Sequence, residues 1–184
     1  MYRRSYYRSR SAKYSNETVS FNTQLTDVTD GGTPFPVTQL PDGSNYNGIP
    51  IVPATPIMGT RKVKNFTIKV TAQNNDDTIY GVLVYVPENT NANEPGVTGP
   101  YQSLYEPNQN VIATFVIPPQ CNRDSLGAIT QSGSPTQIVV SNKLARNLSS
   151  GDSISLLFSS PNGITATDDV PMTISGTVNY SIKF

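Results

Sequence analysis

Alternating apolar and polar residues mark the last segment of the chain. Over residues 172–184 every even position is apolar, aromatic or glycine, as at Ile174, Val178 and Tyr180, and every odd position is polar. A period of two over these 13 residues places successive side chains on opposite faces, which excludes a helix. The segment therefore predicts a long β-strand with one face on a core.

Six further segments have the length and residue types of strands. Residues 79–86 are apolar on both faces, which is typical of a central strand that is covered on both sides. No segment has the 3.6-residue apolar stripe of an amphipathic helix. Strands are predicted at residues 17–26, 63–72, 79–86, 111–117, 137–140 and 153–158.

Clusters of Gly, Pro and Asn separate these strands by long, irregular connections. Such connections favour a sandwich of two sheets over an up-and-down barrel, whose hairpins are short. The chain has 184 residues, of which 14% are charged, and this length suits one all-β domain. We predict an all-β fold, with a single β-sandwich over residues 15–184 and an arm formed by residues 1–14.

The region 27–60 combines prolines with apolar residues. It contains six of the 15 prolines, and proline cannot donate a hydrogen bond to the middle of a sheet, so loop or sheet edge is predicted. Its apolar residues either cover the chain's own core or contact a neighbouring subunit. The candidate subunit-interface residues are Ile49, Ile51, Val52, Ile57 and Met58.

The composition argues against catalysis and against a bound metal. The chain contains no histidine, so His-activated nucleophiles and imidazole ligands are excluded. Its one cysteine, Cys121, fits an unreactive turn residue. The pairs Asp76-Asp77 and Asp168-Asp169 fit solvated turns, because neighbouring side chains on an extended chain point in opposite directions. We predict no enzymatic activity, no cofactor and no metal site. No run approaches the ~18 apolar residues that span a bilayer, so membrane insertion is not expected.

Charge is divided unevenly along the chain. Residues 1–14 include five basic and no acidic residues, whereas residues 15–184 include eight basic and 13 acidic residues. A basic arm on an acidic body is typical of proteins that bind nucleic acid or an anionic surface. Tyrosines alternate with the arginines, and their rings can stack on unpaired bases, which favours single-stranded nucleic acid. The candidate nucleic-acid-binding residues of the arm are Tyr2, Arg3, Arg4, Tyr6, Tyr7, Arg8, Arg10 and Lys13.

A second basic cluster lies at the start of the strand predicted at 63–72. Arg61, Lys62 and Lys64 form this cluster, and we predict that they bind the same nucleic acid. An ordinary solvated strand start is an equally good interpretation of these three residues. For the arm, the alternatives are a solubilising tail, a nuclear localisation signal and a transit peptide.

Five pieces of the chain occur in the same order as in a known family. They are YSNETVSFN at 14–22, GTRKVKNFTI at 59–68, GVLVYVPENT at 81–90, SLYEPNQNVI at 103–112 and RNLSSGDSI at 146–154. Together they resemble the coat proteins of circular, Rep-encoding single-stranded DNA viruses, most closely the circovirus-like members sampled from the environment. The piece at 103–112 is the most specific of the five.

The resemblance implies a single jelly roll of two antiparallel four-stranded sheets with long loops. It also implies a virion in which sixty copies form the smallest icosahedral shell (T=1) around a circular single-stranded DNA genome bound by the arm. Assembly in the host nucleus and a host cell-surface glycan as a further partner are expectations of the same kind. The competing interpretation is a monomeric or low-oligomer sandwich that binds a carbohydrate or another ligand, although the chain has no Trp for a sugar platform.

Overall fold

The computed structural model describes residues 13–25, 37–39, 45–56, 58–90, 110–124, 128–135, 137–159 and 172–184. Within these ranges the protein contains strands and turns but no helix, and hence no helix that could cross a membrane. Residues 1–12 of the arm, Ile57, Asp168 and Asp169 lie outside the described residues.

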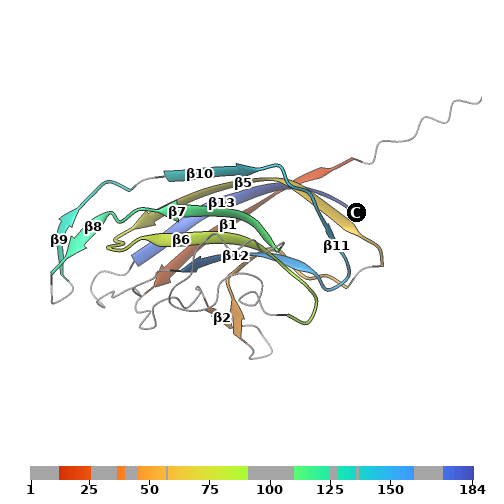
Figure 1. The fold of residues 1–184 in the computed structure, drawn as a ribbon, viewed down its shortest axis with the longest axis horizontal. Helices are drawn as coiled ribbons and strands as arrows, with labels where there is room; N and C mark the ends of the chain where they lie inside the picture. The colour runs from red at the N-terminus through yellow and green to blue at the C-terminus, as the bar shows by residue number, and fades with distance from the viewer. Residues whose placement is uncertain are drawn as a thin grey trace, which may run out of the picture.

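Two antiparallel sheets, of five and four strands, face each other across the core (Figure 1). The first sheet has the order β1-β13-β5-β10, with β11 pairing to one end of β5. The second has the order β4-β12-β6-β7. The first sheet contains β1 (Ser15–Leu25), β13 (Met172–Lys183), β5 (Arg61–Gln73), β10 (Gln137–Asn142) and β11 (Arg146–Leu148). The second sheet contains β4 (Ile49–Val52), β12 (Ser153–Ser159), β6 (Ile79–Val86) and β7 (Val111–Ile117).

Two short hairpin-like pairs add to the sandwich. One is formed by β2 (Val37–Gln39) and β3 (Asn45–Asn47), and the other by β8 (Cys121–Arg123) and β9 (Ile129–Ser132). In Figure 1, β8 and β9 project from the left end of the molecule.

Without the short β11, the two sheets contain eight strands whose pairing is nested: the outermost strands in chain order pair with each other, and so do the innermost. In chain order the first strand pairs with the eighth (β1 with β13) and the third with the sixth (β5 with β10). The second pairs with the seventh (β4 with β12) and the fourth with the fifth (β6 with β7). This nested pairing, divided over two sheets, is a jelly roll. The predicted fold class is confirmed, with β11 as an addition to the first sheet.

Alternate residues of both sheets fill one hydrophobic core. The ring of Phe158 in β12 lies 6.2 Å from that of Phe21 in β1 and 6.1 Å from that of Phe115 in β7, between centroids. Such tilted and edge-on arrangements are favourable for aromatic rings. A Cβ at Gly81 would lie 2.2 Å from the Phe115 ring, so β6 requires a glycine at this position. The contact between Phe21 and Phe158 therefore joins the two sheets.

The proline-rich region contributes an edge strand that the sequence did not reveal. Ile49, Ile51 and Val52 in β4 have exposed fractions of 9%, 0% and 1% and belong to the chain's own core. Their prediction as subunit-interface residues is therefore wrong, because these side chains are not accessible to a second subunit. Pro50 is tolerated because β4 lies at the edge of its sheet. Met58, by contrast, is fully exposed, and its interface role stays a prediction.

Candidate functional site

The outer face of the first sheet carries exposed and half-buried lysines among short polar side chains. Lys62, Lys64 and Lys69 come from β5, and Lys183 comes from β13. In both strands these positions alternate with buried residues that face the core. We call this surface the lysine face. Its uncharged part, from β1, β5, β10 and β13, includes Asn16, Thr18, Ser20, Asn22, Thr67, Thr71, Gln73, Gln137, Val139, Ser141, Thr173, Ser175, Thr177, Asn179 and Ser181.

A bulge in β5 brings these lysines onto one face. Asn65 has a φ of 57°, in the left-handed region that Asn tolerates better than most residues. At this point the register with β13 shifts, so that Thr67 lies opposite Asn179 while Lys64 lies opposite Ser181. One inserted residue reverses the inward and outward positions beyond it. Without the bulge, Lys64 and Lys69 would project from opposite faces of the sheet.

The lysine face carries no acidic residue among the described residues. Glu17 lies opposite the buried Tyr180, which is a position on the other side of the sheet. None of the four lysines forms an ion pair with a described carboxylate. The remaining described acidic residues lie in connections between strands: Asp76, Asp77, Glu88, Asp124 and Asp152. The face therefore has a positive potential that no carboxylate side chain in the described part of the chain cancels.

One corner of the face concentrates this charge. Lys62 lies directly opposite Lys183, with Lys64 and Ser181 as the next outward-facing pair. Like charges directly opposite each other on neighbouring strands destabilise a sheet. An anion bound between the two ammonium groups would relieve this repulsion.

The arm joins the body at this same corner. Ser15, the first residue of β1, lies opposite Ile182, and its hydroxyl donates to the Ile182 carbonyl oxygen at 3.3 Å. The Nζ atom of Lys64 lies 3.9 Å from the centroid of the Tyr14 ring, a cation–π contact. Lys13 is exposed beside it. The other candidate residues of the arm lie outside the described residues, and their roles stay predictions.

Arg61 does not belong to this surface, although the sequence placed it with Lys62 and Lys64. Its exposed fraction is 2%, because its position in β5 faces the core. Its guanidinium donates to the carbonyl oxygens of Pro53 at 2.8 Å and Asp152 at 2.7 Å, and to the Thr55 hydroxyl at 3.3 Å. Burial lowers the pKa of Arg61, against an opposing effect of the Asp152 charge. Arg61 therefore joins the two sheets internally, and its prediction as a nucleic-acid-binding residue is wrong.

Asp152 is the centre of the buried polar network that includes Arg61. Its carboxylate accepts hydrogen bonds from the Tyr85 hydroxyl at 2.8 Å and from the backbone N–H groups of Ser149 at 2.7 Å and Glu88 at 3.1 Å. Burial, followed by the hydrogen bond to Asp152, raises the pKa of Tyr85 to about 12. This network fixes the turn before β12. Its hydrogen bonds hold backbone segments together, which is a structural role.

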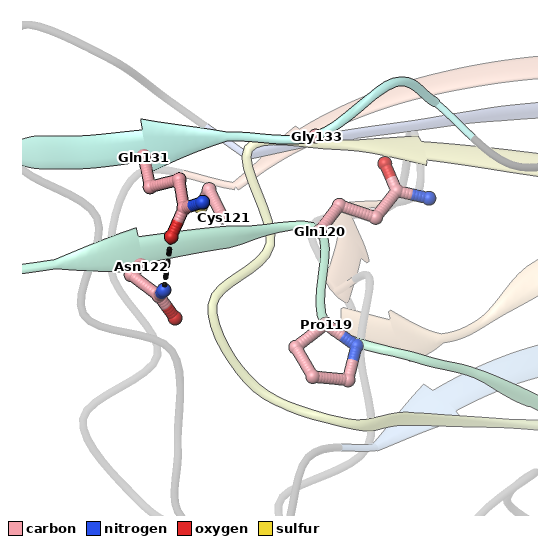
Figure 2. Close-up of a pocket in the computed structure, with 6 residues that line it drawn as sticks. All are labelled: Pro119, Gln120, Cys121, Asn122, Gln131 and Gly133. Atoms are coloured by element: carbon pink, nitrogen blue, oxygen red, sulfur yellow. Dashed lines mark hydrogen bonds between the residues drawn. The ribbon is translucent and has the colours of Figure 1, made fainter.

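A shallow depression of about 240 Å³ lies next to β8 and β9 (Figure 2). In Figure 2, Asn122 and Gln131 point toward each other, and the Asn122 amide donates to Gln131 Oε1 at 3.1 Å. Cys121 is buried, and burial raises the pKa of its thiol, which makes the thiolate less available. The lining residues are Pro119, Gln120, Cys121, Asn122, Gln131 and Gly133, and none of them offers an aromatic platform for a sugar ring.

Sequence reasoning named Lys62 and Lys64 but missed Lys69, Lys183 and Tyr14 as members of one surface. The alternation in the strands at 63–72 and 172–184 puts Lys69 and Lys183 among outward-facing polar residues. The pairing of the two strands, which brings their polar faces together, has no local signal in the sequence. It follows from the jelly-roll connectivity.

The sequence matches no known protein family and no curated protein. Among solved structures, it is similar to a chain in the structure of the infectious bursal disease virus Gx strain, with a TM-score of 0.27 and 9% identity. The similarity covers 90% of this chain and 32% of that chain, so this protein spans about a third of the neighbour's length. A likeness of this strength carries no conclusion about function.

Proposed function

We propose that this protein is a viral coat protein. In this proposal, about sixty jelly-roll domains form a closed icosahedral shell, and the basic arms package a circular single-stranded DNA genome. The protein acts by assembly and binding, without catalysis. It is a component of the virion, and assembly takes place in the host nucleus.

The position of the arm carries the proposal. The chain enters β1 at the corner where Tyr14 contacts Lys64 and where Lys62 faces Lys183. The arginines of the arm are therefore tethered next to a surface of the body on which the described residues include no carboxylate side chain. Such continuous positive charge attracts phosphates without regard to sequence, as genome packaging requires.

The sequence resemblance adds the viral context, since a jelly roll by itself does not define a function. Four of the five resembling pieces overlap β1, β5, β6 and the segment from β11 to β12. The resemblance is thus distributed over both sheets.

The test is expression of the full chain beside a variant with Arg3, Arg4, Arg8 and Arg10 replaced by Gln. Sedimentation and negative-stain imaging report on particles, and the absorbance ratio at 260 and 280 nm reports on nucleic acid. We expect uniform shells for the wild type and a severalfold lower nucleic-acid content for the Gln variant. Replacement of the same four arginines by Lys preserves the charge and is the matched control, which should package normally.

A monomer under all salt and pH conditions tested would overturn the proposal. Specific binding of that monomer on a glycan array would then identify the protein as a carbohydrate-binding sandwich instead.

A further inference from the structure

We propose that the lysine face is itself a binding surface for the phosphate backbone of single-stranded nucleic acid, separate from the arm. The corner formed by Lys62, Lys64 and Lys183 is its strongest site. This inference rests on the proposed function and deepens it, because it places a second part of the packaging surface on the folded domain.

The distribution of lysines over the body is the first argument. The body has five lysines, of which Lys62, Lys64, Lys69 and Lys183 project from the lysine face, and Lys143 follows β10 of the same sheet. The arginines Arg61 and Arg123 are instead used internally: Arg61 holds backbone carbonyls, and Arg123 donates to Asn74 and lies 3.7 Å from Asp76. Exposed lysine charge of the body is therefore concentrated on a single sheet.

The cross-strand lysine pair is the second argument. Lys62 opposite Lys183 is unfavourable in the free protein, and no described carboxylate compensates it. A phosphate between the two ammonium groups would convert this repulsion into two charge-assisted contacts. A bound anion therefore stabilises this pair of lysines more than it would stabilise an isolated lysine.

The neutral residues of the face suit the remainder of a nucleotide. Thr177 lies opposite Lys69, and Ser181 lies opposite Lys64, so each of these two lysines has a hydroxyl neighbour that can bond phosphate or sugar oxygens. From Lys62 to Lys69 the strand extends over roughly 20 Å at about 3.3 Å per residue. This length accommodates several nucleotides, within the range of about 4–16 nucleotides typical of single-strand sites.

Tyr14 favours a single strand over a duplex at the corner. Its ring is held beside Lys64 at 3.9 Å, at the junction of arm and body. An aromatic ring beside a backbone-binding lysine can stack on an unpaired base, which a duplex does not offer.

The experiment measures binding of a fluorescent oligothymidylate of about 16 nucleotides at several salt concentrations. The starting protein is the full chain with Arg3, Arg4, Arg8 and Arg10 replaced by Gln, which leaves the lysine face intact. We expect residual binding by this arm variant. Adding K62Q and K183Q should then lower the salt slope, the change in log K with log salt, by about 0.7, since the two lysines share one phosphate and each phosphate contact to a single strand contributes about 0.7.

The matched control adds K62R and K183R to the arm variant, which preserves both charges and should preserve the slope. Thermal unfolding of each variant verifies the fold. Loss of all binding in the arm variant, with normal binding by the wild type, would overturn the inference and leave the proposed function intact. No binding by the wild type would overturn both. Tighter binding of a heparin fragment of equal charge than of the oligonucleotide would reassign the face to sulfated glycans and overturn the inference.

Discussion

The two sheets share one core but differ on their outer faces. The outer face of the first sheet carries lysines and short polar residues. The outer face of the second sheet carries Val82, Val84, Val86 and Leu157, all with exposed fractions of 3% or less. A sandwich core requires only one apolar face from each sheet. The apolar outer face of the second sheet is nevertheless buried in the folded chain, so it contributes to stability, whereas the lysine face is open to solvent.

A carboxylate introduced on the outer face of the second sheet should destabilise the protein far more than one introduced on the lysine face, and this is the largest effect that we expect. V84D places a carboxylate at a fully buried position and should lower the free energy of unfolding by more than about 4 kcal/mol. T177D places a carboxylate opposite Lys69 on the lysine face and should change it by less than about 0.5 kcal/mol. Urea unfolding of the two variants makes the measurement. Similar losses for both would show that the lysine face is not a free surface.

Substitutions of the neighbouring residues Arg61 and Lys62 in β5 should differ nearly as much in their effect on the free energy of unfolding. R61L removes the donors to the carbonyl oxygens of Pro53 and Asp152 and should cost about 2–4 kcal/mol. K62L changes the exposed neighbour and should not destabilise the protein, because it also removes the repulsion with Lys183. Denaturant unfolding compares them, while oligonucleotide binding should weaken in K62L. A stable R61L protein would contradict the structural role assigned to the guanidinium.

High pH should weaken the network around Asp152. The pKa of Tyr85 is raised from about 10 in the unfolded chain to about 12 in the folded protein, so folding favours its protonated form. The stability contributed by this shift is complete below pH 10 and is lost as the pH rises toward 12. Absorbance at 295 nm should therefore show one fewer late-ionising tyrosine in Y85F than in the wild type, in which burial also raises the pKa of Tyr180. Y85F should also lose stability less steeply in this pH range, and an unchanged pH profile would exclude Tyr85 as the cause.

The smallest expected effect concerns the repulsion at the lysine corner. K183Q removes one charge of the pair with Lys62 and should raise the free energy of unfolding by about 0.2–1 kcal/mol at low salt. The gain should vanish near 1 M salt, where the Debye length is about 3 Å. K69Q is the control, because Lys69 faces Thr177 and Val139 and no lysine. An equal gain in both variants would mean that general net charge, and not the pair, sets the effect.

The regular part of the fold was predictable from the sequence. The strands at 79–86 and 111–117 have the predicted bounds, and β13 ends one residue before the prediction. Inward-facing apolar residues recur along each of them, apart from Gly81, Gly176 and a register shift between β6 and β7. In contrast, β4 was missed, because Pro50 and its neighbouring prolines indicate a loop, and only edge placement reconciles proline with a strand. The same omission led to the wrong interface assignment of Ile49, Ile51 and Val52.

The candidate site was only partly predictable. The sequence predicted one basic cluster of Arg61, Lys62 and Lys64. In the structure, alternation along the strand places Arg61 in the core and the two lysines on the outer face. Predicting this would have required extending the strand back to residue 61. The bulge at Asn65 and the neighbourhood of Lys183 depend on pairing between distant strands, which local patterns do not encode.

The nested pairing of strands also determines at which stage of folding the corner with Lys62, Lys64 and Lys183 forms. The hydrogen bond between Ser15 and Ile182 joins residues 167 positions apart, so β1 is ordered only after a very long loop has closed. Long-range closure of this kind makes folding slow relative to proteins with local contacts. Tyr14, Lys64 and Lys183 come from three distant segments and meet only in the completed jelly roll. A ligand that requires both the arm and the corner therefore discriminates finished molecules from partly folded ones, which carry the arm alone.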